Sequence, residues 1–284
     1  MFGKKKRSAS KNNKPEAQNQ IADNSLRIRL ANGSVIGVGN AQHQGRRPYQ
    51  EDSCGYSDLS NEMLINSKGI LAVLSDGMGG LSNGKEVSNA TVQGMIEYFN
   101  NPQTDCSGAL PLQRHAERIN EAICNKFCSD GRINAGATLV CAMINAGMLH
   151  WLCIGDSRLY LKRNGMLYQV NEDHDYLNTL LDEAIADGTS LKEAFSDPQK
   201  DVLVSCIGNA KLPRTDVSLK GLELKSGDVI VLCSDGIYNA IPEEFIKNLL
   251  DADPQTAAQY IEEAVLKQNI KTQDNFTVIV ISYD

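Results

Sequence analysis

The chain has 284 residues, of which 42% are hydrophobic and 22% charged, and its formal net charge at pH 7 is −7. This length fits one large domain or two small ones, and the composition is that of a globular protein without extensive disorder. The acidic balance disfavours nucleic acid as a partner and suits a cation site. The sequence shows neither an uninterrupted apolar run of about 20 residues nor an N-terminal signal peptide. We therefore expect a cytoplasmic protein without a transmembrane segment.

The N-terminal segment differs from the rest of the chain in charge. Residues 1–20 carry a surplus of +5, so the remainder carries −12 of the total of −7. The segment consists mainly of Lys, Asn, Gln and Ser, and such a composition does not form a packed core. We predict a disordered basic tail over residues 1–24, with a weak electrostatic anchor to an anionic surface as the alternative. The folded domain is expected over residues 25–284.

Apolar runs of strand length follow the tail. Several are continuous rather than alternating, which is typical of strands buried on both faces. The Gly-containing links at 145–147 and 163–165 predict hairpins. The predicted strands, in chain order, are Ile36–Asn40, Ile70–Leu74, Ala137–Ile144, Leu149–Ile154, Arg158–Leu161, Val202–Ile207, Val229–Cys233 and Phe276–Ile281.

Helical periodicity lies between clusters of these runs. Pro254 divides the last helical segment into two helices. Because strand clusters alternate with helix pairs, we predict an α+β fold in which helices cover two packed sheets, rather than a doubly wound parallel sheet. The predicted helical segments are Gly84–Phe99, Leu110–Phe127, Asp175–Ala186 and Glu243–Lys267.

Acidic residues gather where the predicted strands begin or end, usually beside glycine. Each site alone is typical of a turn. Together they would collect carboxylates at one sheet edge, where they would repel one another unless a cation neutralised them. Oxygen ligands favour Mg²⁺ or Mn²⁺ over zinc, and the glycines let backbone carbonyls approach such an ion. The acidic residues are Glu51, Asp52, Asp76, Asp156, Asp235 and Asp274.

Six short motifs appear in a fixed order along the chain. They are Arg47–Asp52 (RPYQED), Ser75–Gly80 (SDGMGG), Gly136–Thr138 (GAT), Gly155–Arg158 (GDSR), Ser234–Gly236 (SDG) and Asp274–Asn275 (DN). Each is unspecific alone, but the ordered set resembles the metal-dependent protein phosphatase family, type 2C. The likeness covers residue 35 to the C-terminus and is closer to the bacterial branch, because Met78 stands where animal members carry His.

The resemblance implies a four-layer α-β-β-α sandwich, with two mostly antiparallel sheets covered by helix pairs and a metal centre at one edge. Residues 175–200 correspond to the family's flap, a variable element that helps to choose substrates. By motif position, Asp76 bridges two metals and Arg47 grips the substrate phosphate. The implied metal ligands are Glu51, Asp52, Asp76, the carbonyl of Gly77, Asp235 and Asp274, with Asp156 assigned to a third ion.

The function implied by this resemblance is that of a metal-dependent protein serine/threonine phosphatase. A binuclear Mn²⁺ or Mg²⁺ centre would activate a water that hydrolyses phosphoserine or phosphothreonine in one step. The expected partners are phosphorylated targets of a Ser/Thr kinase, and the enzyme is expected to be a monomer. Two alternatives stay open: a non-catalytic relative that binds phosphoproteins, and a hydrolase of small phosphate esters on the same fold.

Two positions depart from the family pattern. Gln50 stands where bacterial members usually have Asn, and we expect it to support the loop. Asn239 stands where the family commonly has an Asp that holds the third ion. A neutral amide weakens the hold on a cation, so we expect the third site to be weak or empty. The competing explanation is that Asn239 caps the helix that begins near Pro242.

Overall fold

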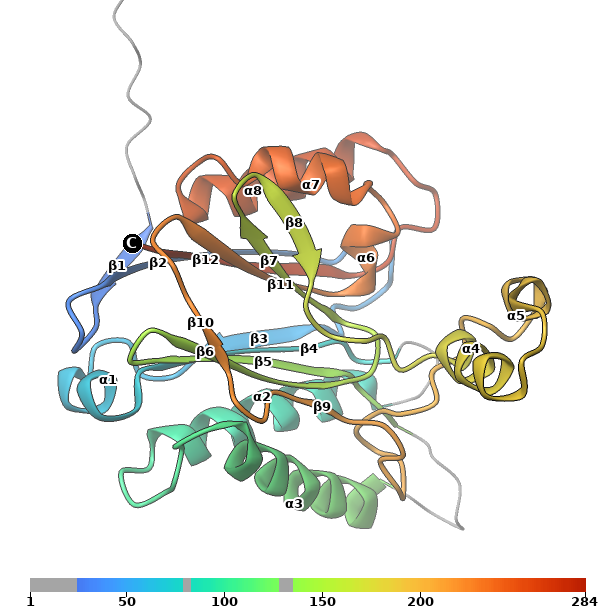
Figure 1. Cartoon of the computed structure of the whole chain (residues 1–284), viewed down its shortest axis with the longest axis horizontal. Coiled ribbons are helices and arrows are strands. Elements are labelled where there is room, and N and C mark those ends of the chain that lie inside the picture. The colour runs from blue at the N-terminus through green and yellow to red at the C-terminus, as the bar shows by residue number, and fades with distance from the viewer. Residues whose placement is uncertain (1–24, 79–82, 128–134) are drawn as a thin grey trace, which may run out of the picture.

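A computed structural model describes residues 25–78, 83–127 and 135–284 (Figure 1). The predicted basic tail, residues 1–24, lies outside the described residues, as do Gly79 and Gly80 of the second motif. The disorder predicted for the tail therefore stays a prediction.

Two antiparallel sheets form the centre of the molecule (Figure 1). Sheet A has the order β1 (Leu26–Arg29), β2 (Val35–His43), β12 (Phe276–Tyr283), β11 (Asp228–Cys233), β7 (Arg158–Arg163) and β8 (Met166–Gln169). Sheet B has the order β10 (Leu222–Glu223), β6 (Met148–Ile154), β5 (Leu139–Asn145), β4 (Ile70–Ser75) and β3 (Ser53–Tyr56), and β9 (Asp216–Val217) also pairs with β6.

Helix pairs cover the outer faces of both sheets (Figure 1). On sheet B they are α2 (Gly84–Asn100) and α3 (Ala109–Phe127), and on sheet A they are α7 (Glu243–Leu249) and α8 (Pro254–Lys267). The short helices α1 (Glu62–Lys68) and α6 (Asp235–Tyr238) lie at sheet edges, while α4 (Tyr176–Asp187) and α5 (Leu191–Ser196) project from one end of the sandwich. No helix among the described residues is long and apolar enough to cross a membrane.

Three hydrophobic core layers separate the four layers of secondary structure. The side chains of β4 alternate between two of these core layers. Ile70, Ala72 and Leu74 lie in the core between the sheets, whereas Leu71 and Val73 lie in the core beneath α2 and α3. Both faces of this strand are buried, which explains its continuous apolar run. The predicted four-layer sandwich of antiparallel sheets is confirmed.

One predicted strand is wrong. Val202–Ile207 forms only isolated bridges, Leu203 with Asp175 and Ile207 with Ala137. This segment leads back from α5 to the body of the domain, so its backbone bonds first to the residues before α4 and then to Ala137 instead of forming one ladder. Val202 is 56% exposed, so apolar composition alone misled the prediction.

Candidate metal centre

The acidic side chains predicted at strand ends meet at one edge of the paired sheets because of the strand registers. In sheet B, Ser53 pairs with Ser75, which places Asp52 beside Asp76. In sheet A, Cys233 pairs with Val278, which brings the start of α6 towards the start of β12. Antiparallel pairing therefore aligns residues that lie far apart in the sequence. Asp76 feels the charges of Asp52, Asp235, Asp156 and Asp274.

Asp52 connects the two sheets. Its Oδ2 accepts hydrogen bonds from Ser234 Oγ at 2.9 Å and from Thr277 Oγ1 at 2.7 Å, both donated by sheet A. Its Oδ1 is buried and has no hydrogen-bond partner among the described residues. Burial raises the pKa of Asp52 to about 6, although side-chain hydrogen bonds with Thr277, Ser234 and the neighbouring carboxyl of Asp76 act in the opposite direction. A buried oxygen without a partner is costly and indicates that a cation or a proton belongs there.

Burial and mutual repulsion act on the other carboxyls as well. Burial, followed by the charges of the neighbouring aspartates, holds the pKa of Asp76 well above its usual range. The same two causes raise the pKa of Asp156 to about 7, and they raise the pKa of Asp235. Near neutral pH this group of carboxyls cannot ionise fully without a compensating positive charge.

The acidic residues at this edge have the donor atoms that a hard divalent cation needs, but their side chains are not arranged around a common ligand position. No group of three or more His, Cys, Asp and Glu side chains within the described ranges is arranged as a ready-made ligand set. Besides Asp52, two further carboxylates bond to protein groups, Asp274 to Arg47 and Asp235 to Asn239. The oxygen-only donors and the unpartnered Oδ1 of Asp52 suit Mg²⁺ or Mn²⁺. Binding would require Asp274 and Asp235 to exchange these partners for the ion.

Arg47 lies at the rim of the carboxylate group. Its Nη2 donates to Asp274 Oδ2 at 2.6 Å, and the two side chains are 42% and 38% exposed. This hydrogen bond is the main cause that raises the pKa of the guanidinium. Because the pair faces solvent, Arg47 is available to bind an oxyanion with its planar fork.

Asn275 clamps the loop that carries Arg47, a role the sequence did not reveal. Its Oδ1 accepts from the Glu51 backbone N–H at 2.8 Å, and its Nδ2 donates to the backbone oxygens of Gln44 and Tyr49 at 2.7 and 2.9 Å. Its own backbone N–H donates to Asp274 Oδ1 at 2.8 Å. The side chain is 4% exposed, so these contacts are shielded from water. One residue thus holds both the arginine loop and the neighbouring carboxylate.

The structure explains why Gln50 and Gly77, which lie next to the acidic group, are a glutamine and a glycine. Gln50 Oε1 accepts from the Asp52 backbone N–H at 3.0 Å, which confirms that this amide supports the loop. Gly77 packs so closely that an added Cβ would lie 2.6 Å from the backbone oxygens of Glu51 and Gly84. Glycine is therefore required at position 77 for packing, and ligation by its carbonyl remains a prediction.

Asn239 contacts Asp235 rather than the helix that follows. Helix α7 has Pro242 at its N-cap and receives no side-chain capping bond, so the capping explanation is wrong. Asn239 Nδ2 donates instead to Asp235 Oδ2 at 3.2 Å. Asp156 is fixed by the Tyr238 hydroxyl, which donates to its backbone oxygen at 3.0 Å. The amide therefore takes up one of the carboxylate oxygens that a cation beside Asp235 would use.

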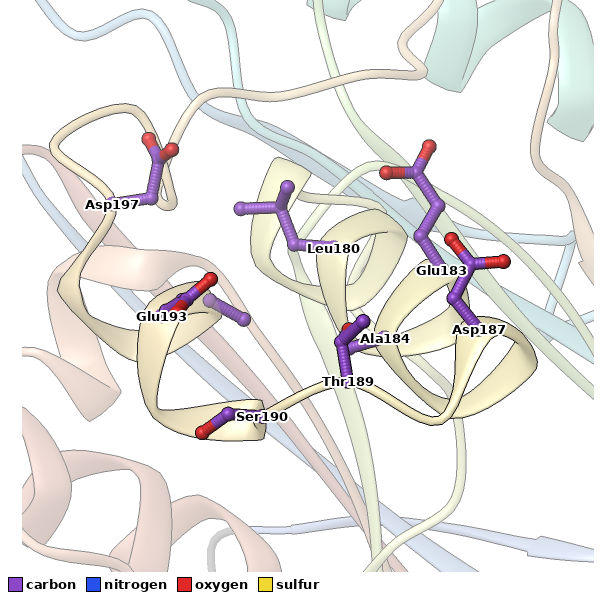
Figure 2. A pocket seen from close by; sticks show the side chains of 9 residues that line it. Leu180, Glu183, Ala184, Asp187, Thr189, Ser190, Glu193 and Asp197 are labelled. Carbon is purple, nitrogen blue, oxygen red and sulfur yellow. The ribbon is translucent and has the colours of Figure 1, made fainter.

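The segment expected to be a flap, residues 175–200, contains a cavity of about 280 Å³ between α4 and α5 (Figure 2). Figure 2 shows carboxylates from both helices and from the following loop around a floor that includes Leu180 and Ala184. Such a lining attracts cationic rather than anionic groups. The acidic side chains are Glu183, Asp187, Glu193 and Asp197.

Comparison with known proteins identifies the class to which this fold and this site belong. The profile of the protein phosphatase 2C family matches residues 40–272, so the chain belongs to that family. The resemblance stated from the motifs is confirmed, and with it the assignment to the phosphoprotein phosphatases.

Bacterial relatives agree with this class. A serine/threonine phosphatase Stp of Listeria monocytogenes is 26% identical over 244 residues, which cover 84% of this chain and 92% of that protein. The serine/threonine protein phosphatase PstP of Mycobacterium tuberculosis is 29% identical over 81% of this chain and 44% of its own length. The catalytic domain of PstP in complex with two manganese ions superposes with a TM-score of 0.68 at 25% identity, covering 88% and 99% of the two chains. Stp1 of Staphylococcus aureus, at 22% identity over 91% and 98% of the two chains, shares the fold with a TM-score of 0.72.

Proposed function

We propose that this chain hydrolyses phosphoserine and phosphothreonine in proteins in a single step that depends on two Mn²⁺ or Mg²⁺ ions. The observation that carries the proposal is the gathering of five aspartates at one sheet edge, with a buried and unpartnered oxygen on Asp52. When bound, the ions would supply charge neutralisation and a water acidic enough to act near neutral pH. The PstP structure with two manganese ions supports the metal dependence.

The chain's own residues would divide the remaining work between them. Asp76 would hold both ions, because it feels the charges of the carboxylates on either side. Asp52, kept in place by Ser234 and Thr277, would present its free Oδ1 towards the centre. The other proposed ligands are Glu51, the carbonyl of Gly77, Asp235 and Asp274.

Arg47 would bind and orient the phosphoryl group. Its guanidinium can offer two parallel N–H donors to two phosphoryl oxygens, and it offsets negative charge there. To do so it must leave Asp274, to which it now donates. A cation at Asp274 would take over that carboxylate and release the arginine, so metal and phosphate binding would assist each other.

Direct attack by water fits the side chains near the carboxylates. Ser157 is 1% exposed, and its Oγ shares a hydrogen bond with Thr138 Oγ1 at 2.7 Å. A hydroxyl so enclosed cannot reach a substrate phosphorus, which disfavours a phosphoenzyme through this residue.

The proposed partners are phosphorylated proteins that a Ser/Thr kinase modifies, with the flap helping to select among them. The acidic cavity in Figure 2 would favour basic residues near the phosphorylated side chain. The enzyme would act as a monomer in the cytoplasm.

The test compares wild type, Asp76→Ala and Asp235→Ala with Mn²⁺ on a phosphopeptide and on a small phosphomonoester. We expect both variants to remain folded by circular dichroism and to lose turnover, and a chelator to silence the wild type. Near-full rates in folded Asp76→Ala would contradict the two-metal assignment. Preference for the small ester would favour the small-ester hydrolase, and phosphopeptide binding without turnover would favour the non-catalytic relative.

A further inference from the structure

Helix α3 carries a buried amide in the face that packs on sheet B. Leu112, Ala116 and Ile123 are buried apolar residues of this helix, and Asn120 stands among them at 6% exposure. An amide buried beside apolar side chains costs free energy unless its polar atoms find partners. The contacts of Asn120 should therefore explain why an amide occupies this position.

Both polar atoms of Asn120 bond to the loop that returns from α5. Its Oδ1 accepts from the Gly208 backbone N–H at 2.7 Å, and its Nδ2 donates to the Asn209 backbone oxygen at 2.8 Å. Cys124, one turn later on α3, donates from Sγ to the Gly208 oxygen at 3.3 Å. Because a thiol is a weak donor, the amide makes the stronger contacts between α3 and this loop.

The same loop pairs with the backbone beside Asp76. The Ile207 N–H donates to the Ala137 oxygen at 2.8 Å, and the Ala137 N–H donates to the Ile207 oxygen at 3.0 Å. Ala137 in turn forms an antiparallel bridge with Gly77, the residue that follows Asp76. Backbone pairing thus extends from the loop to the metal centre.

Thr138 holds both backbone groups of Asp76. Its N–H donates to the Asp76 backbone oxygen at 2.8 Å, and its Oγ1 accepts from the Asp76 N–H at 2.9 Å. On the other side of Gly77, the Met78 N–H donates to the Gly136 oxygen at 3.0 Å. The backbone from Asp76 to Met78 is therefore fixed by the segment that the loop supports.

The segments along this path are in close contact. An added Cβ at Gly208 would overlap the backbone oxygen of Ala135, and one at Gly136 would overlap the side chain of Met78. Ile207 is also fully buried. In packing of this density, a shift of one segment displaces the segment beside it.

We propose that Asn120 is a positioning residue for the metal centre, because it holds the loop over residues 207–209, which positions Asp76 through Ala137 and Thr138. This role rests on the function proposed above, in which Asp76 holds both ions. Without the amide the loop would be held less firmly, and Asp76 would be less well placed to bind metal.

The first test uses the metal-free protein, so its result does not depend on the proposed function. Asn120→Ala removes both hydrogen bonds, and we expect the variant to fold because alanine favours a helix. Amide hydrogen exchange should become about fivefold faster at Ala137, Thr138 and Met78, which lie further along the path than the residues that Asn120 bonds. Exchange in the central strand β12 reports on global unfolding and should change less. Faster exchange confined to Gly208 would overturn the path.

The second test measures Mn²⁺ binding to the full chain by calorimetry. We expect Asn120→Ala to raise the dissociation constant for Mn²⁺ about fivefold. Leu112→Ala is the matched control, since this residue is fully buried on the same helix about 12 Å before Asn120. It should lower Tm but bind Mn²⁺ as the wild type does. If Asn120→Ala does not fold, Asn120→Asp takes its place, because it keeps the shape of the amide and an acceptor for Gly208.

Two results of the calorimetry would overturn the role of Asn120. Equal Mn²⁺ affinity in the wild type and the Asn120 variant would show that the loop does not position the centre. An equal loss of affinity in Leu112→Ala would show that general destabilisation of α3 is the cause. A wild type that binds no Mn²⁺ would instead reject the proposed function, and the exchange test would still decide whether Asn120 holds the backbone at Asp76.

Discussion

Arg47 and Asp274 form an ion pair in which Nη2 of the arginine lies 2.6 Å from Oδ2 of the aspartate. Arg47 is the proposed phosphate-binding residue and Asp274 a proposed metal ligand, so in this structure each side chain is bonded to the other and not to its proposed ligand. The pair is exposed and therefore contributes little to stability. The pair should therefore separate easily when a metal or a phosphate binds. Because the same ion pair must break in both cases, metal binding and phosphate binding depend on each other.

Replacing Arg47 tests the phosphate-binding role. Arg47→Ala should raise the KM for a phosphopeptide about 10- to 100-fold, because a charged two-point contact is lost. Arg47→Lys should recover little of the loss, since a point charge cannot make the planar contact. Arg46→Ala is the neighbouring control and should leave KM nearly unchanged. Equal KM values for wild type and Arg47→Ala would rule out the assignment.

The metal-free protein should become less stable as the pH rises through the range in which its buried carboxyls ionise. Burial raises the pKa of Asp52 to about 6 and that of Asp156 to about 7 in the folded chain, from 3.8 in the unfolded chain. The folded state therefore binds more protons than the unfolded state between these values, so the free energy of unfolding falls with increasing pH. Thermal unfolding of the chelated protein from pH 5 to 8, about the span in which both groups ionise, provides the measurement.

Two controls accompany this pH series. Asp156→Asn should flatten the decrease in Tm towards the upper end of the range, because it removes a group that ionises there. Saturating Mn²⁺ should remove most of the pH dependence by neutralising the carboxylates. A Tm of the chelated protein that is constant or rises over the same range would show that the fold does not raise the pKa values of these carboxyls.

Asn275→Asp should raise KM while changing kcat much less. The substitution keeps the shape but removes the two N–H donors that hold the backbone oxygens of Gln44 and Tyr49. The loop would then position Arg47 less well, and we expect KM to rise about tenfold. Asn171→Asp is a matched control, because Asn171 is also 4% exposed and donates to a backbone oxygen, that of Ser157. If both variants lowered Tm and neither changed KM, Asn275 would have a structural role only.

Asn239→Asp tests the third ion. The amide now donates to Asp235 Oδ2, and a carboxylate in its place would repel Asp235 until a cation bound between them. We expect calorimetry to show stronger or additional Mn²⁺ binding in Asn239→Asp, and activity to reach its half-maximum at a lower Mn²⁺ concentration. Identical stoichiometry and affinity in the two proteins would mean that position 239 takes no part in a third site.

The sequence alone determined the architecture because its signals are local and repeated. Continuous apolar runs such as β4 predicted strands buried on both faces, and helix pairs between strand clusters predicted covered sheets. The six acidic residues were visible near the beginnings or ends of predicted strands, three of them beside glycine, and the ordered motifs resembled those of a family. The sequence does not predict the short elements, because they contain too few residues to show a periodicity. These elements, of two to seven residues each, are β1, β3, β9, β10, α1 and α5.

The tertiary structure decided what each side chain touches, since those contacts join residues far apart in the chain. The bond from Thr277 to Asp52 spans 225 positions, and the pairing of Arg47 with Asp274 spans 227. No periodicity or local propensity encodes such a distance, because sheet register and packing create the contact only when the strands align. For the same reason the sequence predicts a strand at Val202–Ile207 and does not predict the hydrogen bonds of Asn275: an apolar run or a lone amide has no defined partner until the fold supplies one.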